Sequence, residues 1–100
     1  MTNYIYAATG EAVGFWHDQY VYAISGRPIG QLKGTHVHKL SGEYVGELLK
    51  DMVVDKHLGN FGSIGNSGDP GNAGNPGIPG SRGALNYGYP DVFNKLLGDR

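Results

Sequence analysis

The sequence contains no cysteine among its 100 residues, which excludes a disulfide, a thiolate nucleophile and a cysteine-ligated zinc. Charged residues are few and balanced, with eight Lys or Arg against nine Asp or Glu and a net charge of −1. Because nucleic acids and anionic membranes attract basic surfaces, this balance argues against both as partners.

Long apolar runs are also missing, which argues against a transmembrane helix. The first residues lead directly into a strand-like pattern, without the basic and apolar stretches of a signal peptide. A cytoplasmic location is therefore the default expectation, although leaderless export would leave no trace in the sequence. The length predicts one small domain with a modest core.

Glycine, by contrast, is abundant: the chain has 18, against an average usage of about 7%. Many of these glycines belong to a sixteen-residue repeat, whose copies begin at Tyr4, Tyr20 and His36 and whose degenerate fourth copy begins at Met52. In the first three copies, Thr or Ser precedes a glycine, and a second glycine follows four residues after the first.

Each copy begins with alternating side chains that are typical of a strand. One equivalent position is aliphatic in all four copies, and it is occupied by Ile5, Val21, Val37 and Val53. The residues on either side of it should point to the opposite face, since successive strand side chains alternate. The Thr/Ser-Gly pair predicts a tight turn into a second strand, so each copy is interpreted as a β-hairpin.

The second glycine of each hairpin, at Gly14, Gly30 or Gly46, falls inside the second strand. Glycine at such a position indicates a bulge or a close approach of another segment. A bulge would also place two apolar residues three positions apart, such as Val13 and Trp16, on one face. We therefore predict a bulge at each of these glycines.

The fold class predicted from this pattern is all-β, with four sixteen-residue hairpins in a pseudo-four-fold arrangement. Single hairpins are unstable in water, so the copies must share a core. A closed cluster limits exposed strand edges and is favoured over an open solenoid, whereas propeller blades need about four strands each.

The Gly-x-x-x-Gly units, followed by Val53-Val54-Asp55 at the start of the fourth copy, resemble the small bacterial family of four-fold β-flower proteins. The resemblance covers roughly residues 4–62. It implies four hairpin-like petals around a pseudo-four-fold axis, and it brings no established activity.

After the repeats, glycine recurs at every third position: 59, 62, 65, 68, 71, 74, 77, 80 and 83. A period of three predicts polyproline II and matches the collagen-like Gly-X-Y pattern. A collagen-like homotrimer and side-by-side packing, within one chain or between chains, both fit; a flexible linker would not need such strict phase. We expect a homo-oligomer formed through this tract or through the tyrosine-rich face.

At the C-terminal end, Pro90 suits the first position of a helix, and Val92, Phe93, Leu96 and Leu97 form an apolar stripe. The predicted helix has about two turns and must dock on the β-domain or on a partner. The expected organisation is a repeat domain over 1–58, a Gly-X-Y segment over 59–83 and a C-terminal segment over 84–100, together forming one compact unit.

Histidine supplies the main candidates for chemistry. His36 and His38 share a strand face and could be paired metal ligands, with His57 as a third. However, they occupy the positions of tyrosine pairs in the other copies, so a packing role is favoured. Glu11, Glu43 and Glu47 are interpreted as solvated, and no nucleophile adjoins a base. No catalytic residue, metal or cofactor is predicted.

The six residues at these paired positions are the candidate binding face: Tyr4, Tyr6, Tyr20, Tyr22, His36 and His38. Such a face could bind a sugar or a peptide, although tyrosine rows more often belong to a core or a subunit interface. The favoured interpretation is a non-enzymatic structural or interaction module in which the glycine tract mediates packing or oligomerisation. The alternatives are a small-ligand or carbohydrate binder that uses this face, and a metal-dependent enzyme that uses His36 and His38.

Overall fold

In the computed structural model, the described residues form seven strands and one short helix. The structure describes residues 3–56 and 88–97, and between them residues 62, 64, 65, 68, 70, 71, 73, 74, 76, 77, 79, 80, 83 and 84. The elements are β1 (Asn3–Tyr6), β2 (Ala12–His17), β3 (Tyr20–Ala23), β4 (Pro28–Lys33), β5 (His36–Lys39), β6 (Tyr44–Leu49), β7 (Met52–Val54) and α1 (Asn94–Leu97).

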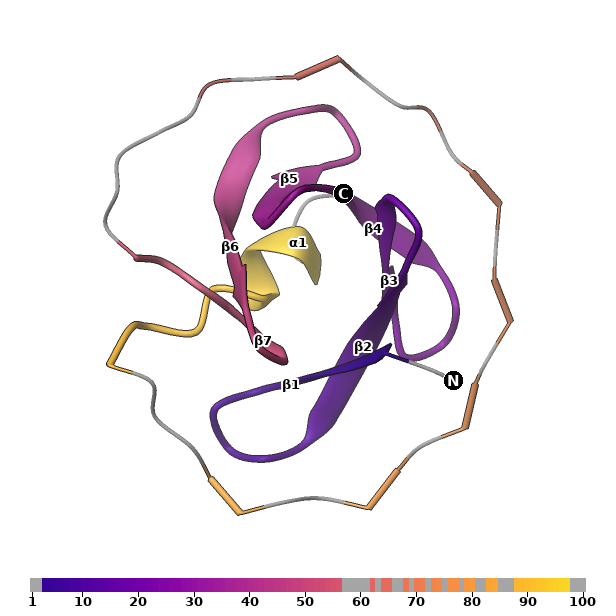
Figure 1. The fold of residues 1–100 in the computed structure, drawn as a ribbon. Helices are drawn as coiled ribbons and strands as arrows, with labels where there is room; N and C mark the ends of the chain where they lie inside the picture. Colours follow the sequence, from indigo (N-terminus) through magenta and orange to yellow (C-terminus); the bar gives the residue numbers. More distant parts are fainter. Residues whose placement is uncertain are drawn as a thin grey trace.

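Each strand pairs antiparallel with the next, so the sheet follows chain order from β1 to β7. The sheet curves into a nearly closed barrel, with α1 at its centre in Figure 1. Its two ends meet where the backbone N–H of Tyr6 donates to the carbonyl oxygen of Asp51 at 2.7 Å. The predicted all-β fold of repeated hairpins is therefore confirmed.

The hairpin tips are alike in the three complete copies. Gly10, Gly26 and Gly42 have φ angles of 96°, 96° and 107°, which side chains larger than hydrogen rarely adopt. Each of these glycines donates its N–H to the carbonyl three residues earlier, at 2.8 to 2.9 Å. The Thr/Ser-Gly pair thus forms the tight turn that the sequence predicts.

The predicted bulges are present at the second glycine of each hairpin. Ile5 pairs with Gly14 but Tyr6 pairs with Ala12, so Val13 is the extra residue in β2. The same register shift occurs beside Gly30 and beside Gly46. As expected, Val13 and Trp16 both pack against the core, because the extra residue brings them to one face.

These three glycines also make room for the C-terminal segment. A β-carbon on Gly30 would lie 2.8 Å from the carbonyl oxygen of His38 and 3.0 Å from a methyl carbon of Leu96. A β-carbon on Gly14 would lie 2.8 Å from the Phe93 ring. Only glycine therefore lets the barrel wall approach the central segment this closely.

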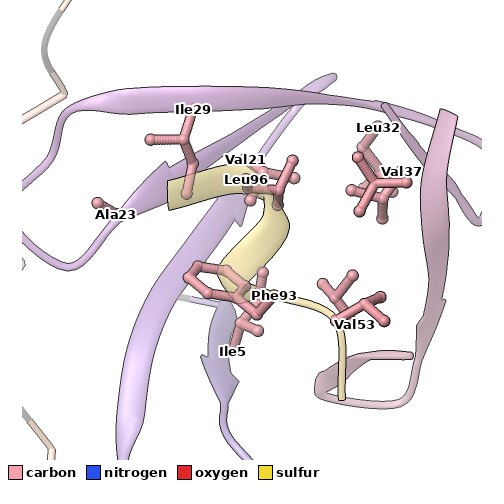
Figure 2. Packing of buried hydrophobic residues seen from close by; sticks show 11 residues of the cluster. Ile5, Val21, Ala23, Ile29, Leu32, Val37, Val53, Phe93 and Leu96 are labelled. Carbon is pink, nitrogen blue, oxygen red and sulfur yellow. The ribbon is translucent and has the colours of Figure 1, made fainter. Parts of the chain in front are cut away.

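The core lies between this segment and the inner faces of the strands. Phe93 and Leu96 are 1% and 2% exposed, and the four equivalent aliphatic residues around them are fully buried. Figure 2 shows Phe93 and Leu96 pointing toward side chains from strands on different sides of the barrel. The C-terminal segment is thus a plug for the repeats, rather than a clamp on their outside.

The plug also supplies a partner for β7. Asp91 forms an isolated antiparallel bridge with Val54, and the N–H of Val92 donates to the carbonyl oxygen of Val53 at 3.0 Å. The Asp91 carboxylate accepts hydrogen bonds from the N–H groups of Ala8 and Phe93, both at 3.0 Å. The two-turn helix predicted from Pro90 is therefore wrong in extent: residues 90–92 extend along β7, and the helix begins only at Asn94.

The described parts of the Gly-X-Y tract lie around the outside of the barrel in Figure 1. Five of its glycines, at positions 62, 68, 71, 74 and 77, have φ between 71° and 94°. Polyproline II requires φ near −75°, so the prediction of regular polyproline II needs correction at these glycines. At these five positions, glycine instead provides a residue without a side chain where φ is positive.

Candidate functional site

The predicted Tyr/His face lies on the side of β1, β3 and β5 opposite the core, and the chain itself covers part of it. The Tyr4 hydroxyl lies 3.2 Å from each of the carbonyl oxygens of Pro76 and Gly77, and it can donate to either. On the adjacent strand β4, the side-chain amide nitrogen of Gln31 lies 3.0 to 3.2 Å from the carbonyl oxygens of Lys39, Leu40 and Gly65, and its two hydrogens are shared among them. Tyr4 of this face and the neighbouring Gln31 therefore both bind the glycine tract.

The tyrosines of the second hairpin pack on one another. Tyr22 stacks on Phe15 with ring centres 5.1 Å apart and planes 10° from parallel, and Tyr20 leans on Tyr22 at 6.5 Å. Tyr22 is only 7% exposed, and burial, followed by the nearby Tyr20 and Asp18, raises the pKa of its hydroxyl. This geometry favours packing over an open aromatic cleft.

In the third hairpin, the histidines lie beside Tyr44. His38 is 2% exposed, and its Nδ1 lies 3.0 Å from the carbonyl oxygen of Gly42, so this nitrogen carries the hydrogen that bonds it. The rings of His36 and His38 contact Tyr44 edge-on, with ring centres 6.0 and 5.5 Å away. His38 therefore fills a packing position, as Tyr22 does in the second hairpin.

Glu47 corrects the prediction of a solvated carboxylate, because it is only 4% exposed. Its carboxylate accepts hydrogen bonds from the Thr35 hydroxyl at 2.9 Å and the Tyr44 hydroxyl at 3.1 Å. The Nε2 of His36 lies 3.4 Å away and forms an ion pair with the carboxylate when the ring is protonated. These partners offset the cost of burying the charge.

The same arrangement holds Tyr44 in its neutral form. Burial, the hydrogen bond to Glu47 and the negative charges of Glu47 and Asp55 raise the pKa of Tyr44 to about 12. A phenol that stays protonated can donate to the carboxylate over the whole neutral range. The cluster of Thr35, His36, Tyr44 and Glu47 is thus a satisfied polar network within the barrel wall.

A metal centre at His36 and His38 finds no third ligand in the part of the chain that the structure describes. Within those residues, no group of three His, Cys, Asp or Glu side chains could hold an ion. His57, the third ligand suggested by the sequence, lies outside the described residues. The two imidazoles also have ring centres 6.4 Å apart, and each is in contact with Tyr44.

A pocket of about 480 Å³ was not anticipated from the sequence. It is lined by Trp16, Leu32 and Leu48 together with residues 18–19 and 33–35 of two turns. Its three apolar residues are sixteen positions apart, so they occupy equivalent positions of the repeat. The repeat indicated that these positions face the core, but it did not indicate a cavity between them. The pocket lies at the end of the barrel wall where β2 turns into β3 and β4 turns into β5.

With this geometry established, comparison with known proteins is informative. The family model of the 4-fold beta flower protein matches residues 3–88. The chain belongs to this family. Comparisons with curated proteins and with solved structures found no match.

For this β-flower chain, the matched region contains the three hairpins, β7 and the tract, and it ends before Asp91. The residues that plug the barrel therefore lie beyond the family match. Among the described residues, no helix has the length and apolar character that crossing a membrane requires.

Proposed function

We propose that this β-flower chain is a non-enzymatic interaction module that self-associates through its glycine tract. Its polar side chains support the non-enzymatic part, because they are engaged with the chain's own groups. Glu47, His38 and Asp91 bond to hydroxyls or backbone groups of the same chain, and Gln31 bonds to three carbonyls. Such bonds stabilise the fold, and groups that are held in them are not placed to exchange a proton with a substrate.

One observation carries the role of the tract: its backbone bonds to two successive hairpin tips. The N–H of Ile64 donates to the carbonyl oxygen of Gly42 at 2.9 Å, and the N–H of Ala73 donates to that of Gly26 at 2.8 Å. Positions 64 and 73 are nine residues apart, or three Gly-X-Y triplets, while the two tips are one repeat apart. Between these two bonds, three triplets therefore span one hairpin.

Three of the tract glycines support self-association. At Gly65, Gly80 and Gly83, no atom of the described residues lies within 4 Å of where a β-carbon would be, and φ is not in the positive range. Neither backbone conformation nor packing in this chain thus requires glycine there. Because the tract is the outermost part of the molecule in Figure 1, a second copy can approach this bare backbone closely.

The test is the molar mass in solution, measured by size-exclusion chromatography with light scattering. We expect the wild-type chain to be an oligomer, and the triple variant Gly65→Ala, Gly80→Ala, Gly83→Ala to be a monomer with an unchanged circular dichroism spectrum. The matched control is Thr9→Ala, Ser25→Ala, Ser41→Ala, which changes three exposed hairpin-tip residues and should leave the oligomer intact.

A monomeric wild-type chain over a wide concentration range would contradict self-association and would leave the tract as an intrachain girdle. An oligomer that persists in the triple variant would move the interface away from these glycines. A trimer would support a collagen-like association of three tracts, whereas a dimer or tetramer would support side-by-side packing of tracts from different chains.

A further inference from the structure

The pocket at the end of the barrel lies close to the pseudo-four-fold axis. Trp16, Leu32 and Leu48 occupy the same position in three successive repeats, yet they line one cavity. Residues related by rotation can share a cavity only if it lies near the rotation axis. Gly14 on β2 is next to the ring of Phe93, which fills the barrel at that point. Trp16 follows Gly14 by two residues on the same inner face, so the pocket lies beyond Phe93 along the barrel.

The rim of the pocket is polar and carries no net charge. It is formed by Asp18, Gln19, Lys33 and Thr35, with Gly34 between the last two. The Thr35 hydroxyl already donates to Glu47, and the Asp18 carboxylate lies 3.3 Å from Nε2 of His17. The rim side chains offer hydrogen-bond acceptors and donors, and the charges of Asp18 and Lys33 cancel. A strongly anionic or cationic ligand would therefore gain little at this rim.

The turns that carry the rim are fixed in place. The N–H of Leu32 donates to the carbonyl oxygen of Gln19, and the N–H of Leu48 donates to that of Thr35, both at 2.8 Å. Asp18 adopts a φ of 54°, a conformation that costs free energy for a residue with a side chain and persists only where its surroundings impose it. The polar groups are therefore held on a rigid scaffold around the apolar residues.

We propose that this pocket binds a neutral saccharide. A pyranose ring has one face of C–H groups, which can pack against the indole of Trp16, and a periphery of hydroxyls that both donate and accept hydrogen bonds. A purely apolar ligand would displace water from exposed polar groups such as the Asp18 carboxylate without replacing its hydrogen bonds, which is costly. The volume of about 480 Å³ lies within the range of about 300–1,000 Å³ for small-molecule sites.

The experiment uses the fluorescence of Trp16, the only tryptophan in the chain, as a direct reporter of the pocket. The full chain is titrated with methyl α-glucoside, methyl α-galactoside, methyl α-mannoside and N-acetylglucosamine. Glucuronate, cyclohexanol and glycerol serve as charged, apolar and acyclic comparisons. We expect a saturable change in emission with at least one saccharide and none with the three comparison compounds.

The matched variants are Asp18→Asn and Asp51→Asn, which change carboxylates in two equivalent turns. Only Asp18 lines the pocket, and asparagine tolerates its left-handed φ, so the turn should be retained. We expect Asp18→Asn to weaken saccharide binding about fivefold, because asparagine keeps a hydrogen-bond acceptor but loses the charge that strengthens the bond, and Asp51→Asn to have no effect. Circular dichroism of both variants checks that the fold is intact.

Three outcomes would overturn the proposal. They are the absence of a saturable response to every saccharide, a tighter response to glucuronate or cyclohexanol than to any saccharide, and equal affinity of the wild type and Asp18→Asn. Chemical shift changes at the amides of Gly34 and Thr35 provide a second measurement that does not depend on tryptophan.

Discussion

The barrel and the tract both depend on regularly spaced glycines, but for opposite physical reasons. In the barrel, a β-carbon on Gly46 would lie 2.6 Å from the carbonyl oxygen of Val54 and 2.9 Å from a methyl carbon of Val92. In the tract, a β-carbon on Gly71 would meet no atom of the described residues within 4 Å, yet φ there is 94°. Glycine is thus required by crowding in the barrel, and by backbone conformation at the tract glycines with positive φ.

The difference shows that a glycine repeat has no single structural meaning. The sixteen-residue spacing in the barrel reflects three approaches to one central plug, which comes from a distant part of the chain. At five tract glycines the three-residue spacing coincides with a positive φ, and no atom of the described residues occupies the place that a β-carbon would take there. Substitutions at each kind of glycine, and in the plug itself, test this distinction.

The largest effect is expected from Phe93→Ala, which removes the plug that the barrel glycines accommodate. Phe93 is 1% exposed, and deleting a buried aromatic side chain costs about 3–5 kcal/mol of unfolding free energy. Urea denaturation followed by circular dichroism measures the loss. Tyr89→Ala is the control, since Tyr89 is exposed and its removal should change stability by less than about 0.5 kcal/mol. Similar stabilities of the two variants would refute the assignment of the plug.

A smaller loss is expected from Gly46→Ala. The new methyl group meets a backbone carbonyl that cannot move without breaking sheet pairing, and overpacking of this kind costs about 2 kcal/mol. The thermal midpoint should fall by about 10 °C for a domain of this size. If the thermal midpoint of Gly46→Ala equals that of the wild type within experimental error, Gly46 does not lie as close to Val54 and Val92 as the structure shows.

The tract should respond locally to Gly71→Ala. A positive φ costs a residue with a side chain about 1–2 kcal/mol, which the tract can relieve by separating from the hairpin tip. Hydrogen exchange at the amide of Ala73, which bonds to Gly26, should accelerate about tenfold, with global stability unchanged. Gly80→Ala, where φ is not positive, is the matched substitution and should leave exchange at Ala73 unaltered. A global loss of stability in Gly71→Ala would mean that the two regions unfold together.

The smallest effect is a pH dependence that belongs to the barrel alone. Because the pKa of Tyr44 rises from 10.0 to about 12 in the folded chain, the native state holds this proton more tightly than the unfolded state does. The resulting stabilisation is fully present below pH 10 and is lost as pH rises toward about 12. Urea midpoints over this range should fall less steeply for Tyr44→Phe than for the wild type. Parallel curves would show that Tyr44 does not carry the dependence.

The hairpins and bulges could be predicted because their causes are local. Alternation around Val21, the Ser25-Gly26 turn and the register shift beside Gly30 all lie within one repeat. The plug could not be predicted in the same way, since the close approach of Gly30 to Leu96 joins residues far apart in the chain. The spacing of apolar residues indicated that residues 92–97 form a segment that must pack against another part of the protein. It did not indicate that this segment lies at the centre of the barrel.

The candidate site was predicted less well than the fold. Glu47 was interpreted as solvated from its residue type, although the equivalent position in the first repeat holds Phe15, which is buried in the structure. Repeat equivalence therefore carried a signal of burial that residue type obscured. The partners that make this burial possible, Thr35 and Tyr44, come from the adjacent turn and from the same strand, and their convergence depends on the register of β5 and β6.

The position of the plug also sets an order of events during synthesis. The hairpins emerge from the ribosome before residues 91–97, so we expect the glycine-lined inner wall to face water while the tract is still being made. The bond between Ala8 and Asp91 joins residues 83 positions apart, and such distant contacts form late because their loop entropy must be overcome first. We therefore expect the hairpins of a nascent β-flower chain to stay only partly folded until residues 91–97 have been made and can fill the barrel.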